Sequence, residues 1–261
     1  MFDFHMHTDV SYDGRATAAQ MLKAAEEAGL REICFTDHLD YDPLKPDNKL
    51  TFDTSSYRAA YDSLSHPFVK IRRGMEFGML SDNMEVLKAD LARFDFDFVL
   101  GSVHFVDGFD IYLKDFWKHV TIDYAETRFL EQTLECVQNH DDFDVLGHLT
   151  YITKTRANPV KRPVVYEQYR ELVDEILSVL AYKGKGIEVN TSGINIAGVY
   201  LPSSDYLRRF KELGGEIVTV GSDAHDTSRV GQLCREACDI VQEIFGHVCT
   251  FADRKPVFHK V

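Results

Sequence analysis

Two histidines stand one residue apart near the start of the chain, His5 and His7 in the run HMHTD. Side chains two positions apart on a β-strand point to the same face, so both imidazoles can bind one metal ion. Such a pair also occurs by chance. It indicates a metal site only if other parts of the chain supply further ligands.

Further ligand-type side chains recur where other short apolar runs end. A single histidine in such a place is more often a core or loop residue, but recurrence reverses that expectation, because six of the 11 histidines fall in these motifs. Glycines beside several of them are expected to let the backbone turn sharply. The motifs are HMH (His5, His7), TDH (His38), GMEFG (Glu76), GSVH (His104), GHL (His148) and GSDAH (Asp223, His225).

Mixed imidazole and carboxylate groups are typical ligands of zinc, manganese or iron, whereas magnesium and calcium favour oxygen alone. The candidates are too numerous for one tetrahedral ion. A cluster of ions bridged by a carboxylate is the simpler arrangement, and such clusters suit the hydrolysis of phosphate esters.

The elements that must position these residues alternate between short β-branched or aromatic runs and longer amphipathic stretches, which predicts strands and helices around a parallel sheet. We expect an α/β fold, a distorted (β/α)7 TIM-like barrel with the metal site at the carboxyl ends of the strands. One domain over 1–261 is expected because no linker divides the chain, with a long excursion at 39–67. The expected strands are 2–7, 32–38, 69–77, 97–104, 144–149, 186–191 and 216–223, and the expected helices are 18–28, 84–92, 123–136, 165–181, 203–213 and 231–244.

The composition, with 44% hydrophobic and 27% charged residues, is that of a globular domain. No apolar run is long enough to cross a bilayer, and the first residues lack the pattern of a signal peptide, so we expect a cytoplasmic protein with no membrane partner. The five cysteines contain no CxxC pair, which argues against disulfides and against a thiolate zinc site. A net charge of −13 disfavours nucleic acid as a partner, although bound cations would make the site itself locally positive. The oligomeric state stays open.

In this order, the motifs show a resemblance to the polymerase and histidinol phosphatase (PHP) family, above all to its monofunctional histidinol-phosphate phosphatases. The resemblance runs almost end to end, through HMHTDVSYDG, FTDH, GMEFG, GSVH, GHL, EVNTSG and GSDAH. It implies about three divalent cations. One would be held by His5, His7, Glu76 and Asp223, a second by Glu76, His104 and His148, and a third by His38, His225 and Asp13, although Asp13 could instead be a turn residue.

Basic residues follow the fifth expected strand, at Lys154, Arg156, Lys161 and Arg162. We expect Arg156 to bind the substrate, because its planar guanidinium can contact two phosphate oxygens at once. A solvated loop is the alternative interpretation of this run.

The resemblance places Asn190 and Ser192 in the substrate pocket, where both could equally serve a turn. Family members commonly have a Leu-Arg pair after TSG, but here Ile194 and Asn195 follow, so a substrate-contacting cation is expected to be missing. The segment 105–117, rich in aromatic and acidic residues, either closes over the site or forms a hydrophobic flap on the barrel.

The resemblance implies a phosphate monoester hydrolase, with L-histidinol phosphate as its small-molecule substrate in histidine biosynthesis. A hydroxide would attack phosphorus in line while Asp223 orients it and Arg156 neutralises the phosphoryl oxygens. Asp223, His225 and a bound water are all candidates to protonate the leaving alkoxide. Two alternatives stay open: a phosphoesterase acting on another phosphorylated metabolite or on nucleic-acid ends, and a non-catalytic metal-binding accessory domain.

Overall fold

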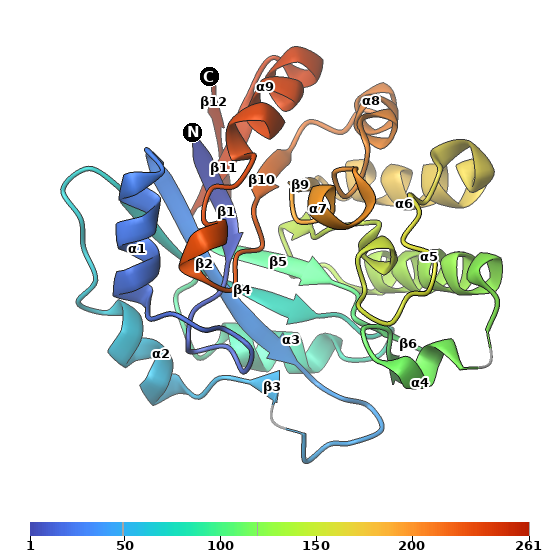
Figure 1. Ribbon diagram of the computed structural model, residues 1–261, viewed down its shortest axis with the longest axis horizontal. Coiled ribbons are helices and arrows are strands. Elements are labelled where there is room, and N and C mark those ends of the chain that lie inside the picture. The colour runs from blue at the N-terminus through green and yellow to red at the C-terminus, as the bar shows by residue number, and fades with distance from the viewer. Residues whose placement is uncertain (49, 119, 261) are drawn as a thin grey trace.

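The computed structural model describes residues 1–48, 50–118 and 120–260. Seven parallel strands form its centre, in the order β1-β2-β4-β5-β8-β9-β10, and Figure 1 shows helices arranged around them. Each of the seven expected strands is present at its expected place. Their bounds are β1 Phe2–Met6, β2 Glu32–Asp40, β4 Lys70–Gly78, β5 Phe98–Ser102, β8 Val145–Leu146, β9 Gly186–Asn190 and β10 Val218–Gly221.

The first and last strands of this sheet meet and bring it close to a closed barrel. Met6 bridges to Ala224 in parallel orientation, the backbone N–H of Asp223 donates to the carbonyl of His5 at 2.7 Å, and that of His7 donates to the carbonyl of Ala224 at 2.8 Å. The pairing of β1 with β2 shifts register between Asp3 and Met6. The expectation of a distorted seven-stranded TIM-like barrel is therefore confirmed.

The helices pack their apolar faces on the outside of the barrel. In α1, for example, Met21, Leu22 and Ala25 form the buried stripe, and a capping box between Thr17 and Gln20 fixes the start of the helix. All six expected helices are present. The bounds are α1 Ala18–Glu27, α2 Thr54–Tyr61, α3 Met84–Leu91, α4 Lys114–Trp117, α5 Ile122–Asn139, α6 Arg170–Tyr182, α7 Ile194–Ala197, α8 Ser204–Glu212 and α9 Cys234–Phe245.

The expected excursion at 39–67 is more ordered than the sequence suggested. Strand β3 (Leu50–Thr51) pairs with the end of β2, and helix α2 begins at an N-cap formed by Asp53. Tyr57 and Tyr61 anchor this helix because both are buried. Because the segment contains prolines, this short helix was not predicted from the sequence.

Two hairpins lie at opposite ends of the barrel. Strands β6 (Phe105–Val106) and β7 (Phe109–Asp110) follow β5 at its carboxyl end. Strands β11 (Val248–Ala252) and β12 (Lys255–His259) lie at the amino end, where Arg254 Nε donates to Asp144 Oδ2 at 2.5 Å. The second hairpin therefore covers the end of the barrel that carries no candidate ligand.

The cysteines and the helices agree with two further expectations. All five cysteines are free and buried. Among the described residues, no helix combines the length and the apolar character that crossing a membrane requires.

Candidate metal centre

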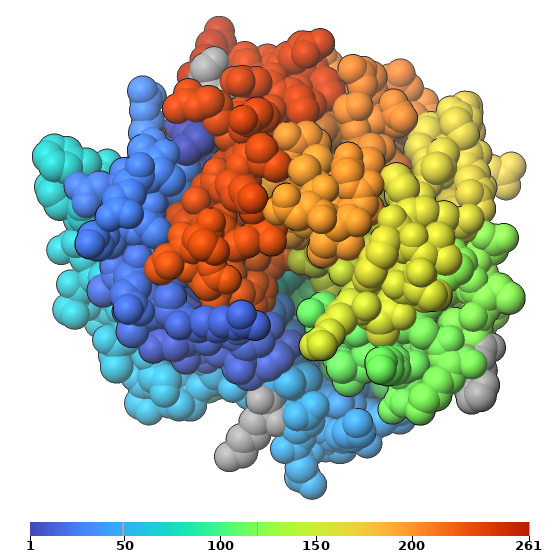
Figure 2. All heavy atoms as spheres, viewed as in Figure 1, coloured from blue at the N-terminus to red at the C-terminus, as the bar shows by residue number. Residues whose placement is uncertain are grey.

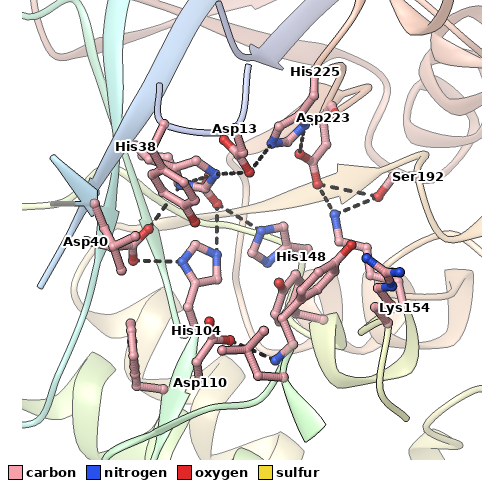
Figure 3. Close-up of a pocket in the computed structure, with 18 of the residues that line it drawn as sticks. Asp13, His38, Asp40, His104, Asp110, His148, Lys154, Ser192, Asp223 and His225 are labelled. Atoms are coloured by element: carbon pink, nitrogen blue, oxygen red, sulfur yellow. Dashed lines mark hydrogen bonds and ion pairs between the residues drawn. The ribbon is translucent and has the colours of Figure 1, made fainter. Parts of the chain in front are cut away.

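A cavity of about 650 Å³ opens at the carboxyl ends of the strands. Figure 2 shows a hollow near the centre of this face, where early, middle and late segments of the chain meet. Two predicted ligands, His5 and His7, lie fully buried beneath the cavity. The other seven line the cavity, and Figure 3 labels most of them. They are Asp13, His38, Glu76, His104, His148, Asp223 and His225.

The side chains of His5, His7, Glu76 and Asp223 converge on one point. The Nε2 atoms of the two histidines are 3.1 Å apart, and they lie 3.3 and 3.4 Å from Glu76 Oε2 and 3.7 and 3.5 Å from Asp223 Oδ1. Ligands about 2.0–2.1 Å from a tetrahedral zinc ion are about 3.3–3.4 Å from one another. The spacing of these four groups fits a single ion.

The second carboxylate oxygen of Glu76 faces two further imidazoles. Glu76 Oε1 lies 2.9 Å from His148 Nε2 and 3.4 Å from His104 Nε2, and Ser102 Oγ donates to it at 2.7 Å. Glu76 therefore has one oxygen toward each of two ligand groups, as a bridging carboxylate must.

The third predicted group is more open. Asp13 Oδ2 lies 3.1 Å from His225 Nε2 and 3.8 Å from His38 Nε2. The ring of His7 stacks between those of His38 and His225, with centroid distances of 4.2 and 4.1 Å. Asp13, which the sequence also allowed as a turn residue, thus points toward both histidines.

Buried polar atoms without hydrogen bonds test whether the site fits cations. His38 Nδ1, Asp40 Oδ2 and Glu76 Oε2 all lack a hydrogen-bond partner, although His38 Nδ1 lies 3.1 Å from both oxygens. Asp13 Oδ1 and His148 Nδ1 are also buried without a partner. Leaving such atoms unsatisfied is costly, so this concentration of them in one site fits bound cations.

The electrostatics of the site agree with this fit. Burial acts to lower the pKa of His5, but the carboxylates of Glu188, Glu76 and Asp223 outweigh it and raise that pKa well above its usual value. Burial likewise acts to lower the pKa of His38. The carboxylates of Glu76 and Asp40 outweigh burial and raise this pKa to about 9. The carboxylates thus draw protons onto these two imidazoles, whereas burial keeps the pKa values of His7 and His148 low, and metal ions would displace the bound protons.

Two carboxylates outside the predicted ligand set hold the imidazoles in place. His5 donates through Nδ1 to Glu188 Oε1 at 2.7 Å, and His104 Nδ1 lies 2.8 Å from Asp40 Oδ1. Such partners orient metal-binding histidines and raise their basicity. Sequence reasoning missed both roles, although each residue stands two positions from a predicted site residue on the same strand, Asp40 from His38 and Glu188 from Asn190.

The glycines beside the ligands act differently from the expectation. Gly147 and Gly221 are not in the left-handed region; instead, His148 and Asp223 themselves take positive φ values of 20° and 55°. A Cβ on Gly221 would lie 2.3 Å from both His5 Cβ and Glu188 Oε1. Gly221 is therefore needed for close packing of β10 against β1, and the prediction of a turning role was wrong.

The basic run divides between the pocket and the surface. Lys154 and Arg156 line the cavity, and Lys154 Nζ contacts Asp223 Oδ2 and donates to Ser192 Oγ at 3.0 Å. Arg162 instead pairs with Glu126, and Lys161 contacts the carbonyl of Thr155, so these two belong to the surface loop. The sequence singled out Arg156 and missed the direct contact made by Lys154.

The two residues after β9 lie at different depths. Ser192 lines the cavity, whereas Asn190 is fully buried and does not line it. Asn190 Nδ2 donates to Glu188 Oε2 at 3.1 Å and to Asp223 Oδ2 at 3.4 Å.

Ile194 and Asn195, which stand where family members commonly have a Leu-Arg pair, lie in helix α7. There Asn195 Nδ2 donates to Gln232 Oε1 at 3.1 Å. Neither residue lines the cavity, but Arg229 does. The segment 105–117 forms one wall through Phe105, Asp110, Tyr112 and Leu113. It is therefore a side of the pocket.

Comparison with known proteins agrees with the geometry. A probable histidinol-phosphatase of Clostridium acetobutylicum is 29% identical over 259 residues, covering 99% of this chain and 96% of that protein. The histidinol-phosphatase of Lactococcus lactis is 29% identical over 97% of this chain and 95% of its own.

Solved structures extend the comparison to the fold. The histidinol phosphate phosphatase of Lactococcus lactis, complexed with zinc, L-histidinol and phosphate, matches with a TM-score of 0.81 at 27% identity and covers 98% of both chains. A putative histidinol phosphatase from Listeria monocytogenes shares the fold at 17% identity, with a TM-score of 0.76 over 91% of this chain and 100% of its own. The family profile described as PHP domain matches residues 3–192, and the chain therefore belongs to the PHP domain family.

Proposed function

We propose that this protein is a metal-dependent phosphate monoester hydrolase that converts L-histidinol phosphate to L-histidinol and phosphate. The observation that carries the proposal is the convergence of His5, His7, Glu76 and Asp223 at the spacing of one metal polyhedron. Similarity along nearly the whole chain to an enzyme solved with zinc, L-histidinol and phosphate supports the choice of substrate.

We propose about three divalent ions, zinc, manganese or iron, held in the single unit 1–261. The support is the mixed imidazole and carboxylate chemistry, with no thiolate among the converging groups. The ligand sets are His5, His7, Glu76 and Asp223 for the first ion, Glu76, His104 and His148 for the second, and Asp13, His38 and His225 for the third.

The charge of such a site explains how an acidic protein would attract phosphate. Three divalent ions carry six positive charges, against five carboxylates in or beside the ligand sets (Asp13, Asp40, Glu76, Glu188 and Asp223). The site keeps a positive excess before Lys154 and Arg156 are counted. The overall charge of −13 therefore does not oppose binding at the bottom of the pocket.

When bound, the metal ions polarise the phosphoryl group and lower the pKa of water, which supplies the nucleophile. Arg156 and Lys154 would bind the phosphoryl oxygens as charge develops on them, and Ser192 would position Lys154 through their hydrogen bond. Asp223 has Oδ1 toward the imidazoles of His5 and His7 and Oδ2 toward Lys154.

We propose that proton handling involves the last ligand motif. Asp223 Oδ2 lies on the side of Lys154, which holds the pKa of this carboxyl well below its usual value, so Asp223 would orient the attacking water as an anion. His225, whose ring Nδ1 lies 3.0 Å from the carbonyl of Asp223, is the neighbouring group that can hold a proton near the leaving oxygen. Asn190 positions Asp223 from below rather than contacting substrate.

The test combines metal analysis with a substrate panel. We expect the purified protein to contain bound transition metal and to hydrolyse L-histidinol phosphate faster than sugar phosphates, nucleotides or single-stranded DNA. Glu76→Ala should lose metal and turnover together, because Glu76 contributes to two ligand groups. Full metal content and full turnover in that variant would refute the cluster, and preference for another phosphate ester would refute the substrate.

A further inference from the structure

Six carboxylates line the pocket, and most have a cationic or imidazole partner. Asp13, Asp40, Glu76 and Asp223 all lie within 4 Å of a histidine nitrogen. The other two are Asp110 and Asp226. Hydrogen bonds from Ser228, with the charges of Arg15 and Arg229, lower the pKa of Asp226, so that carboxylate is already compensated.

Asp110 has no ion pair within the described parts of the chain. Its Oδ1 accepts one hydrogen bond, from the backbone N–H of Tyr112 at 2.8 Å. Burial raises the pKa of the Asp110 carboxyl, although the Tyr112 hydrogen bond and the charge of His104 act against this rise. A partly buried carboxylate without a cation is unfavourable, and a cationic group in the pocket would relieve that cost.

The fold holds Asp110 at a fixed place relative to the proposed metal site. It lies on β7, paired with Phe105 one residue after His104, and the N–H of Ile111 donates to the carbonyl of His104 at 3.1 Å. Figure 3 places Asp110 below His104, with Lys154 on the other side of His148.

A backbone contact connects this wall to the basic one. The N–H of Ala157 donates to the carbonyl of Tyr112 at 3.3 Å, next to Arg156. The backbone therefore fixes the position of the wall that carries Asp110 relative to the wall that carries Arg156. The apolar side chains of Tyr112 and Leu113 line the pocket beside Asp110 and offer a surface for a planar ring.

We propose that Asp110 binds the cationic group of the substrate, so that the pocket selects phosphate monoesters that also carry an ammonium or imidazolium group. The inference rests on the proposed function, because L-histidinol phosphate has both a phosphate and such groups. Asp110 acts on specificity, and the metal site with Lys154 and Arg156 acts on the phosphate.

The experiment compares three substrates in the metal-loaded wild type and in Asp110→Asn. The substrates are L-histidinol phosphate, 3-(imidazol-4-yl)propyl phosphate, which lacks only the amino group, and p-nitrophenyl phosphate, which has no cation. Asparagine keeps an oxygen for the Tyr112 N–H and removes only the charge. We expect kcat/KM for L-histidinol phosphate to fall about 10- to 100-fold, the range of a hydrogen bond to a charged group, with p-nitrophenyl phosphate unchanged.

The imidazole-only substrate tells which cation Asp110 binds. If its turnover is unchanged in Asp110→Asn, the ammonium group is the ligand, and if it falls as well, the imidazolium is. Inhibition by L-histidinol should weaken by a similar factor, which measures binding without turnover. Asp107→Asn is the matched control, because Asp107 is an exposed carboxylate of the same hairpin that pairs with Arg128 and does not line this pocket, and it should leave all three substrates unchanged.

Two results would overturn the inference. One is an equal loss for all three substrates in Asp110→Asn, which would mean a general structural role. The other is no loss for any of them. Neither result concerns the proposed function, which fails only if the wild type itself does not hydrolyse L-histidinol phosphate.

Discussion

Replacing Glu188 by glutamine should weaken metal binding although Glu188 is not a predicted ligand. Three donors converge on its carboxylate: His5 Nδ1 at 2.7 Å, the backbone N–H of His148 at 2.8 Å and Asn190 Nδ2 at 3.1 Å. A carboxylate accepts from all of them. The side chain of glutamine has one acceptor oxygen and one NH2 group, so at least one buried donor would face another donor.

The size of the effect follows from that conflict. Leaving one buried donor unsatisfied costs about 1–3 kcal/mol, and removing the carboxylate partner of a metal-binding histidine typically costs about 10- to 100-fold in metal affinity. These two figures agree, because about 1.4 kcal/mol corresponds to a factor of ten. We therefore expect Glu188→Gln to bind its most tightly held zinc about 10- to 100-fold more weakly.

Chelator competition with a zinc indicator measures this affinity directly. Glu32→Gln is the control, since Glu32 is also buried and ion-paired, with Arg72 Nε at 2.7 Å, but lies at the amino end of β2. It should lower stability and leave zinc affinity unchanged. Wild-type zinc affinity in Glu188→Gln would show that the reasoning about orientation and charge is wrong.

Three further predictions follow from the packing and the cluster. Removing metal with EDTA should lower Tm by roughly 5–10 °C. A ligand at about 100 times its Kd stabilises the folded protein by about 2.7 kcal/mol, and a domain of this size gains about 2–4 °C in Tm per kcal/mol. An unchanged Tm in calorimetry would contradict this prediction. Gly221→Ala should lower the free energy of unfolding in urea by about 1–3 kcal/mol and also reduce zinc content, since the new Cβ would overlap His5 at the seam of the barrel. Normal zinc content in this variant would count against this account. Arg254→Ala should lower the free energy of unfolding by about 1–3 kcal/mol, because it leaves Asp144 without its ion-pair partner. We expect kcat to stay unchanged, because the hairpin lies at the other end of the barrel. Loss of kcat in folded protein would be the contrary result.

The strands and the ligand motifs could be predicted because each depends on local sequence. A short apolar run such as the one before His38 predicts a strand, and parallel strands must present their carboxyl ends on one side. Ligand-type side chains after six such runs then predict a shared site. That logic needs no knowledge of which strands are neighbours.

The supporting contacts could not be predicted because they depend on which strands become neighbours. Asp40 reaches His104 only because β2 continues past His38 and packs near β5. The contact of Lys154 with Asp223 depends on the conformation of the loop after β8, which the sequence does not specify. The hairpin of β11 and β12 turns at Asp253 and Arg254, both at positive φ, so it lacks the glycine that usually marks such a turn in a sequence.

The seam between β1 and β10 has a consequence for how the chain is made. The backbone N–H of Ser222 donates to Asp3 Oδ1 at 2.8 Å across a separation of 219 residues, and proposed ligands of the same ion lie on both sides of the seam. On the ribosome, β1 emerges before the other barrel strands and must wait for all of them before its neighbour β10 exists. Folding that depends on such distant pairing is slow, and the first ion can be fully held only after synthesis of the last barrel strand. Loading of the proposed first ion would thus be a late event, and the ion would link the first strand of the barrel to its last.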